Sequence, residues 1–543
     1  MSFKEKIKDN FGKLIIVVFF ALCVLAMFVL YLMRSKHFNS FNIMCIVVGI
    51  VLFCLILVEL YLAYFKEWPI DRLYMVAGIV LGIVFMFIIP PYATPDERVH
   101  TGAAVHVSNV LMGYGEPDDG INNLYMRNTE YELRTNEYMK KADYRNFLDD
   151  ISFTTSAQEK ELVATNLPYP GPFVLYIIPG IGITIGRLLG FGGTATILLA
   201  TLFNVLFFVI STAFAIKIIP FGKEVIMVIA LFPMVLQLTS SLSYDNAVLT
   251  SFIMVIALEL KWCYAKNIPV TRKEIIVLLL YGSILCMLKG GVYAMFLLLP
   301  FVCNSSKATL KNIWHKYKYW IIAGVVLLLA ILGRNIILSV FGSLFAGTSS
   351  NTAVVESSDA VQAAQTSYSM WDNNYISWAG EEGYSVKFLL QHPLDLIIIL
   401  FNTIIENLSY YASGVVAAPL GWLNIDVPWV YILAYVIVLF MATIKQENTP
   451  DYFKTRDRIW IIVLGLLSIG LSAAAMLIYW TPTSYDSIVG LQGRYFIPPV
   501  IMMVLCIRNG LITTKKKMTS GLFMTMLILE MISAFYVLYA AII

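Results

Sequence analysis

An acidic pair stands where a long apolar run gives way to a polar stretch. In the segment PPYATPDERVH, residues 90–100, Asp96, Glu97 and His100 follow a proline at position 95. A carboxylate at such a place can take a proton from a hydroxyl group, a general-base contribution of about 10² to 10⁴ in rate. The structural alternative is a helix cap, because Asp and Glu are favoured in a first helical turn. Capping needs neither Glu97 nor His100, so we interpret the acidic pair as the candidate catalytic centre.

Other polar side chains recur beside or inside apolar runs. They are Tyr244 and Asp245 in SLSYDNAV, Lys289 in KGG, Arg334 within an apolar run, and Gln492, Arg494 and Tyr495 in GLQGRY. With His100, they form the predicted substrate-binding set, because an ionisable group at or inside a membrane span is a functional hypothesis by default. The cations can hold a phosphate and offset the charge that grows as it leaves. The alternatives are a helix cap for Asp245, a snorkelling Lys289 and an intramembrane ion pair for Arg334.

The acidic pair also has the ligand chemistry of a divalent metal site. Carboxylates suit Mg²⁺ or Mn²⁺, and a metal on Asp96 and Glu97 would bridge the protein to a phosphate. His100 and His106 are six residues apart, a poor spacing for one helical face, so a histidine metal site is not expected. The seven cysteines lie in or beside apolar runs without CxxC spacing, so neither zinc nor a disulfide framework is predicted.

Composition places these residues in a membrane protein. The chain has 543 residues, of which 59% are hydrophobic and 13% charged, against about 25% charged in soluble proteins. The first apolar run, residues 14–33, follows four lysines and precedes no small-residue cleavage site, so we interpret it as a retained signal-anchor. The composition predicts an all-α polytopic protein of the plasma membrane, with membrane lipid and no nucleic acid among its partners.

Apolar runs of about 20 residues mark the expected spans. We place about thirteen, near residues 14–33, 42–65, 73–90, 194–217, 224–241, 246–263, 274–288, 291–304, 320–342, 428–444, 459–479, 495–509 and 520–542. With the N-terminus in the cytoplasm, every strongly basic connector falls inside, as the positive-inside rule requires. The expected division is an N-terminal hairpin over residues 1–72 and a larger transmembrane domain over residues 73–543.

The same topology puts three polar regions outside the cell, at residues 91–171, 343–427 and 480–494. Two further apolar segments are 172–190 and 385–412. If either crossed the membrane, basic connectors would lie on its outer side. We therefore interpret both as helices that lie at the outer interface. The candidate catalytic and substrate-binding residues then share the extracytoplasmic face.

The chain resembles a bacterial membrane family catalogued as domain of unknown function 2142. The resemblance rests on four blocks in order, TPDERVHTGAAVHVSN, PMVLQLTSSLSYDNAV, MLKGGVYAMFLLLP and IVGLQGRYFIPP. That family in turn is similar to the GT-C class of glycosyltransferases, which includes lipid A aminoarabinose transferases and protein O-mannosyltransferases. The similarity runs through the acidic motif, the segment LPYPGPFVLYIIPG, Asp245 and the Lys-Gly hairpin at Lys289.

The resemblance implies a GT-C-like fold and a sugar donor carried on polyprenyl phosphate or diphosphate. It also implies that Asp96 is the base and Glu97 its neighbour or metal partner. Three departures from the class stand out: an additional N-terminal hairpin, no expected soluble C-terminal domain, and a QGRY motif without an assigned role. Phosphate contact by Arg494 is our inference from its charge and position.

The leading functional hypothesis is an extracytoplasmic, inverting glycosyltransferase. Its acceptor would be a hydroxyl of an envelope glycan, a teichoic acid or a protein. One alternative is a transporter or flippase of lipid-linked envelope glycan precursors, which would need polar groups along a path to the cytoplasmic face. Another is a non-enzymatic partner in envelope assembly, for which the acidic pair should matter little.

Overall fold

The structure, a computed structural model, describes most of the chain. The described residues are 3–33, 38–117, 121–156, 158–167, 172–265, 271–287, 291–303, 373–447, 449–508 and 510–541, with Trp314, Lys318 and Trp371. Lys289, Arg334 and the span expected near 320–342 lie outside these residues. The other predicted site residues are all described.

Eight helices of the described part are long and apolar enough to cross a membrane. They are α1 (Phe3–Met33), α2 (Ser40–Tyr64), α3 (Ile70–Ile88), α8 (Gly193–Ile218), α11 (Asp245–Tyr264), α17 (Pro393–Val416), α19 (Thr455–Trp480) and α21 (Thr519–Ala540). Shorter apolar or mixed helices are α7 (Ile177–Leu189), α12 (Arg272–Met287), α18 (Trp429–Thr443) and α20 (Ile497–Ile507). The predicted mostly helical, polytopic membrane class is confirmed.

Two expected spans are not single helices. The one near 224–241 consists of α9 (Lys223–Ala230) and α10 (Pro233–Thr239), because Pro233 has no N–H with which to continue the helical ladder. The one near 291–304 is a 3₁₀ helix (Ala294–Leu298) followed by the short α13 (Leu299–Val302). Residues 225–243 are all buried, so α9 and α10 lie within the bundle and are covered by its other helices.

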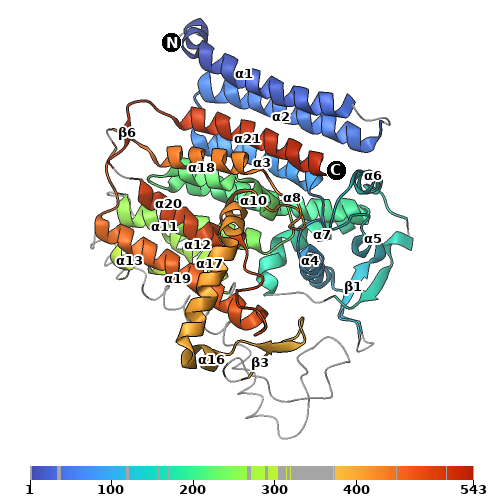
Figure 1. Ribbon diagram of the computed structural model, residues 1–543. Helices are drawn as coiled ribbons and strands as arrows, with labels where there is room; N and C mark the ends of the chain where they lie inside the picture. The colour runs from blue at the N-terminus through green and yellow to red at the C-terminus, as the bar shows by residue number, and fades with distance from the viewer. Residues whose placement is uncertain are drawn as a thin grey trace.

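Figure 1 shows α1 and α2 (blue) along one edge of the bundle, with α21 (red) packed against them.

Small residues allow close contacts between other helices of the bundle. α3 approaches α8 at Gly82, where a Cβ would lie 2.4 Å from Cγ1 of Val205. α7 runs antiparallel to α8, and a Cβ at Gly182 would lie 2.6 Å from the Cα of Ala200. Close backbone approach at small residues is a common basis of helix association in membranes.

The two segments expected at the interface form helices of different kinds. α7, within residues 172–190, packs along the first turns of α8. α17 has 24 residues, which is long enough for a span, so the expectation of a purely interfacial segment at 385–412 is not confirmed. In Figure 1, α17 (orange) runs across the direction of α1, α2 and α21.

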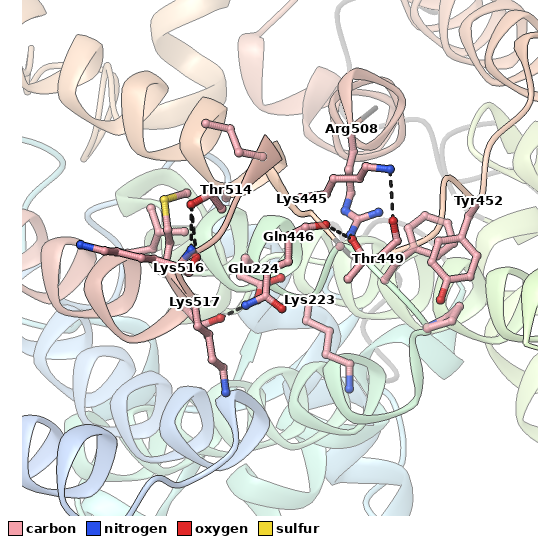
Figure 2. A pocket seen from close by; sticks show the side chains of 18 residues that line it. Lys223, Glu224, Lys445, Gln446, Thr449, Tyr452, Arg508, Thr514, Lys516 and Lys517 are labelled. Atoms are coloured by element: carbon pink, nitrogen blue, oxygen red, sulfur yellow. Dashed lines mark hydrogen bonds between the residues drawn. The ribbon is translucent and has the colours of Figure 1, made fainter. Parts of the chain in front are cut away.

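Short strands pair segments that are distant in sequence. β1 (Leu124–Arg127) is antiparallel to β2 (Leu162–Thr165), and β3 (Asn374–Ile376) is antiparallel to β4 (Glu381–Gly383). β5 (Lys445–Gln446) is parallel to β6 (Thr513–Thr514), so the connectors after α18 and after α20 lie side by side; Figure 2 shows Lys445, Gln446 and Thr514 from close by. The remaining helices of the polar regions are α4 (Glu97–Met112), α5 (Asn128–Tyr131), α6 (Lys141–Asp149) and α16 (Val386–Gln391).

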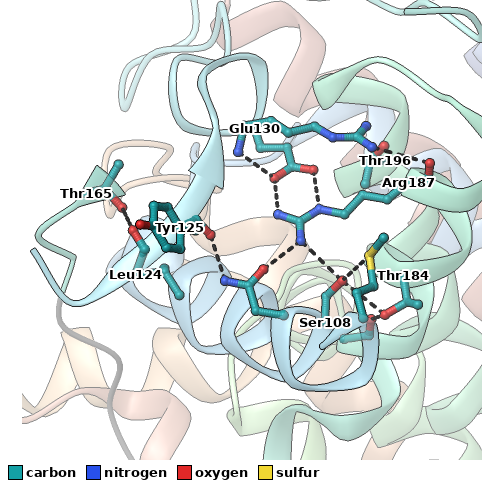
Figure 3. A network of polar contacts seen from close by, with 12 residues as sticks. Ser108, Leu124, Tyr125, Glu130, Thr165, Thr184, Arg187 and Thr196 are labelled. Carbon is teal, nitrogen blue, oxygen red and sulfur yellow. Dashed lines mark hydrogen bonds and ion pairs between the residues drawn. The ribbon is translucent and has the colours of Figure 1, made fainter. Parts of the chain in front are cut away.

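A buried ion pair joins the polar region after α3 to the bundle (Figure 3). Arg187 in α7 donates from Nε to Glu130 Oε1 at 2.8 Å and from Nη2 to Oε2 at 2.6 Å, and neither side chain is exposed. Nη1 of Arg187 donates to Oδ1 of Asn109 in α4 at 2.8 Å. The Tyr92 hydroxyl donates to the carbonyl of Glu130 at 2.6 Å. The pair thus ties α4, α5, α7 and the turn before α4 into one unit.

Replacing Arg187 by methionine would leave the Glu130 carboxylate buried without its cation. We expect Arg187→Met to lower the free energy of unfolding by about 3–5 kcal/mol, the usual range when one partner of a buried pair is removed. Denaturant unfolding of the purified protein in detergent measures the change.

The surface pair Arg134–Asp150 supplies the matched control. Its atoms Nε and Oδ1 are 3.5 Å apart, and the Arg134 side chain is 69% exposed. Arg134→Met should therefore lower the free energy of unfolding by less than about 1 kcal/mol. Similar losses in the two variants would show that the buried pair has no special role in stability.

Candidate functional site

Asp96 has an unusual backbone conformation at the start of α4. Its φ is 61°, in the left-handed region that non-glycine residues seldom adopt, and its side chain makes no capping hydrogen bond to the helix. The capping alternative therefore does not account for this residue, which is exposed. Strained backbone of this kind is concentrated at functional sites, where the surrounding structure holds it in place.

Asp96 lies on the wall of a groove of about 840 Å³. The groove combines aromatic rings with charged and amide groups, including those of Tyr92, Arg98, Asn136, Glu137, Tyr138 and Trp422. Four non-glycine residues of the described chain have positive φ, and Tyr92 and Asp96, both in the groove wall, are two of them. A third, Leu423, directly follows Trp422. Local strain is thus concentrated around this groove.

Glu97 points away from Asp96, into the protein. It is 1% exposed, and its Oε2 accepts hydrogen bonds from the Tyr92 N–H and the Thr94 hydroxyl, each at 2.8 Å. Its Oε1 accepts from the Leu242 N–H at 3.1 Å. Burial raises the pKa of Glu97 to about 7, although these hydrogen bonds act in the opposite direction. Glu97 therefore braces the turn at residues 92–96 against the segment that precedes α11.

The position of Glu97 does not fit the expectation that it acts beside Asp96 or shares a metal ion with it. Both of its oxygens are occupied by protein donors, whereas Asp96 faces the groove. The two carboxylates therefore do not converge on one point. Among the described residues, no group of three or more His, Cys, Asp or Glu side chains has the arrangement of a metal site.

His100 connects α4 to two tyrosines. Its Nδ1 lies 2.8 Å from the hydroxyl of Tyr176, which ends the 3₁₀ helix Phe173–Tyr176, and its ring meets the Tyr244 ring edge-on at 5.0 Å. His100 is 6% exposed, so it shapes the inner wall of the site. Burial raises the pKa of Tyr244, and the charges of Asp245 and Asp96 act in the same direction. Tyr244 thus lies within electrostatic reach of both carboxylates.

An ion pair joins the start of α11 to the last polar region. Arg494 Nε lies 3.5 Å from Asp245 Oδ2, and the two side chains are 10% and 9% exposed. Asp245 is the first residue of α11 rather than its N-cap, which is Tyr244, so its side chain forms an ion pair at the position where a cap had been considered. Burial acts to lower the pKa of Arg494, but Asp245, Tyr495 and Asp96 together raise it above its usual value. The guanidinium therefore stays charged between the two aspartates.

Two polar atoms beside this pair are buried without a hydrogen-bond partner in the described structure. They are Oε1 of Gln492 and Nε of Arg494, and this Nε lies 3.5 Å from Asp245 Oδ2 in the ion pair. Buried polar atoms are normally satisfied, so an exception calls for an explanation such as a ligand. The guanidinium of Arg494 also lies over the ring of Tyr495, 5.6 Å from its centroid, and the Tyr495 carbonyl accepts from the Tyr293 hydroxyl at 2.9 Å.

The structure thus brings most of the predicted residues into one region. Asp96, Tyr244, Asp245 and Arg494 interact electrostatically, with His100, Gln492 and Tyr495 beside them. Glu97 supports this region from behind, and Lys289 and Arg334 lie outside the described residues.

Sequence reasoning missed the groove aromatics Tyr92 and Trp422 and the Glu130–Arg187 pair. Tyr92 and Trp422 carry no sequence signal, because aromatic residues are common throughout this chain. Arg187 did carry one: it is the only charged residue in the apolar segment PFVLYIIPGIGITIGRLLG, and such a residue normally has a partner.

The chain matches one protein family. The family described as "Predicted membrane protein (DUF2142)" matches residues 79–504. The chain belongs to the DUF2142 family. The match begins within α3 and ends within α20, so the DUF2142 region contains Asp96, Asp245 and Arg494 and leaves α1, α2 and α21 outside it. No curated protein and no solved structure matches the chain.

The DUF2142 site leaves no room for a side chain at Gly493, next to Arg494. A Cβ there would lie 2.4 Å from the carbonyl oxygen of Tyr411 and 2.7 Å from the Cα of Gly414, both in α17. We expect Gly493→Ala to destabilise the protein by about 1–3 kcal/mol, because overpacking against backbone forces the elements apart. Thermal or denaturant unfolding in detergent checks this.

Gly470 in α19 is the matched control, since a Cβ there would meet no atom within 4 Å. Gly470→Ala should stabilise the protein by about 0.5–1 kcal/mol, because alanine favours an exposed helix interior. Stabilisation by both substitutions would contradict the close α17–Gly493 contact.

Proposed function

We propose that this DUF2142 protein is a GT-C-like glycosyltransferase of the plasma membrane, with its N-terminus in the cytoplasm and its site on the extracytoplasmic side. It moves a sugar from polyprenyl phosphate or diphosphate to a hydroxyl of an envelope acceptor. One observation carries the proposal: the exposed Asp96 carboxylate, which does not cap its helix, lines a large polar and aromatic groove and interacts electrostatically with the buried Arg494.

In this proposal the groove binds the acceptor of the sugar. Tyr138 and Trp422 offer ring faces, and Asn136, Glu137 and Lys140 offer hydrogen-bonding groups around them. This combination suits a ligand with alternating apolar faces and hydroxyl groups, which describes a sugar ring. A volume of about 840 Å³ accommodates a ligand larger than one sugar, such as the end of an envelope glycan or teichoic acid, or a protein side chain with its flanking residues.

The lipid-linked sugar donor would bind to Arg494 and α17. One face of α17 carries exposed apolar side chains at helical spacing, namely Leu394, Ile397, Ile398, Phe401, Ile404, Ile405 and Leu408. The helix then reaches the site, because a Cβ at Gly414 would lie 3.0 Å from the Cα of Gly493. A polyprenyl tail along this face would bring its phosphate toward Arg494. The Arg494 guanidinium, whose Nε lies 3.5 Å from Asp245, is a donor suited to that phosphate.

In the proposed reaction the Asp96 carboxylate takes the proton of the acceptor hydroxyl. The hydroxyl oxygen attacks C1 of the donor sugar from the side opposite the phosphate. The bond between C1 and the phosphate oxygen breaks, and its electron pair leaves with the polyprenyl phosphate or diphosphate. Arg494 offsets the charge that grows on this leaving group. A single displacement of this kind inverts the configuration at C1.

A divalent metal has no step in this proposal. The pair expected to hold Mg²⁺ or Mn²⁺ does not fit one ion, because Glu97 is enclosed by three protein donors while Asp96 faces the groove. Charge stabilisation at the phosphate is assigned to Arg494 and proton transfer to Asp96.

Asp96→Asn tests the base. Asparagine tolerates the left-handed backbone at this position, so the fold should persist while the proton acceptor is lost. We expect transfer from radiolabelled polyprenyl-phosphate sugar, by full-length protein in nanodiscs with an envelope-glycan acceptor, to fall by about 10² to 10⁴. Unfolding temperature should be unchanged.

Glu116→Gln is the control, because Glu116 is an exposed carboxylate of the same polar region that does not line the groove. This variant should transfer at the wild-type rate. Normal transfer by Asp96→Asn would exclude Asp96 as the base. Movement of the intact labelled lipid between leaflets by the wild type, without transfer, would favour the transporter alternative.

A further inference from the structure

A second polar pocket lies at the other end of the bundle from Asp96. α8 begins at Gly193, where a Cβ would clash with Thr129 beside the Glu130–Arg187 pair, and it ends at Ile218. Its 26 residues span about 39 Å at 1.5 Å per residue. The pocket, of about 190 Å³, is formed where the connectors after α8, after α18 and after α20 meet.

Positive charge dominates this pocket (Figure 2). Five cationic side chains line it, namely Lys223, Lys445, Arg508, Lys516 and Lys517, whereas Glu224 is the one carboxylate in its lining. Oε1 of Glu224 already accepts a hydrogen bond from the Thr519 hydroxyl at 2.7 Å. Nζ of Lys223 donates to the Lys217 carbonyl at 3.2 Å, and Lys516 and Lys517 are exposed and extend outward (Figure 2). Like charges that line one pocket repel one another, so a bound anion would stabilise the arrangement.

The two most enclosed cations are held by the fold. Lys445 is 8% exposed; its Nζ donates to the Thr449 carbonyl at 3.1 Å and lies 3.7 Å from Asp451, which is not part of the pocket lining. Arg508 donates from Nη2 to the Thr449 hydroxyl at 3.3 Å, and its guanidinium lies 5.9 Å from the centroid of the Phe221 ring. The parallel pairing of β5 and β6 keeps the two connectors together. The site is thus built from fixed backbone and side chains.

Burial lowers the pKa of the Arg508 guanidinium, and Glu224, Tyr452 and Asp451 offset the effect only in part. A bound anion would favour the charged form of this guanidinium in the same way. The N-terminus of α9 adds to the positive character, because Gly222 and Lys223 line the pocket and the first N–H groups of a helix have no intrahelical acceptor.

We propose that this pocket binds a phosphate group, supplied by the head group of an anionic lipid or by a soluble phosphate. The volume holds several times the roughly 30 Å³ of a water molecule, which is enough for a phosphate with part of its hydration and too little for a lipid tail. The positive-inside rule assigns this end of the bundle to the cytoplasm, where basic pockets between helices bind lipid head groups. The site is separate from Asp96 and does not depend on the proposed transfer reaction.

Substitutions in the KKK run at residues 515–517 test the site with a built-in control. Lys516 and Lys517 line the pocket, whereas Lys515 does not, and all three side chains are exposed, so folding should be unaffected. Binding of radiolabelled inorganic phosphate to the full-length protein in detergent should saturate. The double variant with Lys516→Gln and Lys517→Gln should weaken phosphate binding at least about tenfold. This is the effect of losing one hydrogen bond to a charged group. Lys515→Gln should weaken it less than about twofold.

Arg508→Gln and Arg508→Lys form the second variant pair. If Arg508→Lys binds phosphate more tightly than Arg508→Gln, the positive charge at this position contributes to phosphate binding. Nanodiscs of phosphatidylcholine with or without phosphatidylglycerol identify the source. Loss of phosphate binding only in the phosphatidylglycerol discs indicates a lipid head group, and equal binding in both discs indicates a soluble phosphate. The proposal is overturned if neither phosphate nor phosphatidylglycerol binds saturably, or if Lys515→Gln weakens binding as much as the pocket variants do.

Discussion

The buried pair of Glu130 and Arg187 is the constraint on which the region around Asp96 depends. A guanidinium with no exposed surface is tolerated only if its donors are matched, and Glu130 and Asn109 meet that requirement. The three residues come from three different elements, so their convergence fixes the relative positions of α4, α5 and α7. The Tyr92 hydroxyl on the Glu130 carbonyl extends the constraint to the turn that carries Asp96.

A second level of support comes from Glu97. Its three hydrogen bonds hold residues 92 and 94 against Leu242, two residues before the tyrosine that neighbours Asp245. The turn at Asp96 is therefore attached to the start of α11, where Asp245 holds Arg494. A rigid frame of internal carboxylates thus surrounds one exposed carboxylate. Preorganisation of this kind is what a general base and a phosphate-binding arginine both require.

The sequence predicted the membrane class and most of the long helices, because runs such as 194–217 and 459–479 carry an unambiguous length signal. It predicted single helices where Pro233 and the segment 291–303 break them, because hydropathy measures apolarity and says little about backbone continuity. At the site, residue type and position favoured Asp96, Asp245 and Arg494, which the structure brings into electrostatic contact. Adjacency in sequence made Glu97 resemble a partner of Asp96, but Asp96 has a left-handed backbone and lines the groove, whereas the Glu97 oxygens accept hydrogen bonds inside the protein. A linear pattern contains no information on that dihedral angle.

The left-handed backbone at Asp96 also limits how the site can change in evolution. Most side chains at this position would strain the turn, whereas asparagine and glycine adopt the conformation readily. A single codon change from Asp to Asn would therefore remove the carboxylate and leave the architecture intact. If the proposed reaction holds, relatives that keep the fold for binding alone should be recognisable by Asn or Gly at this position, a difference of one letter of sequence.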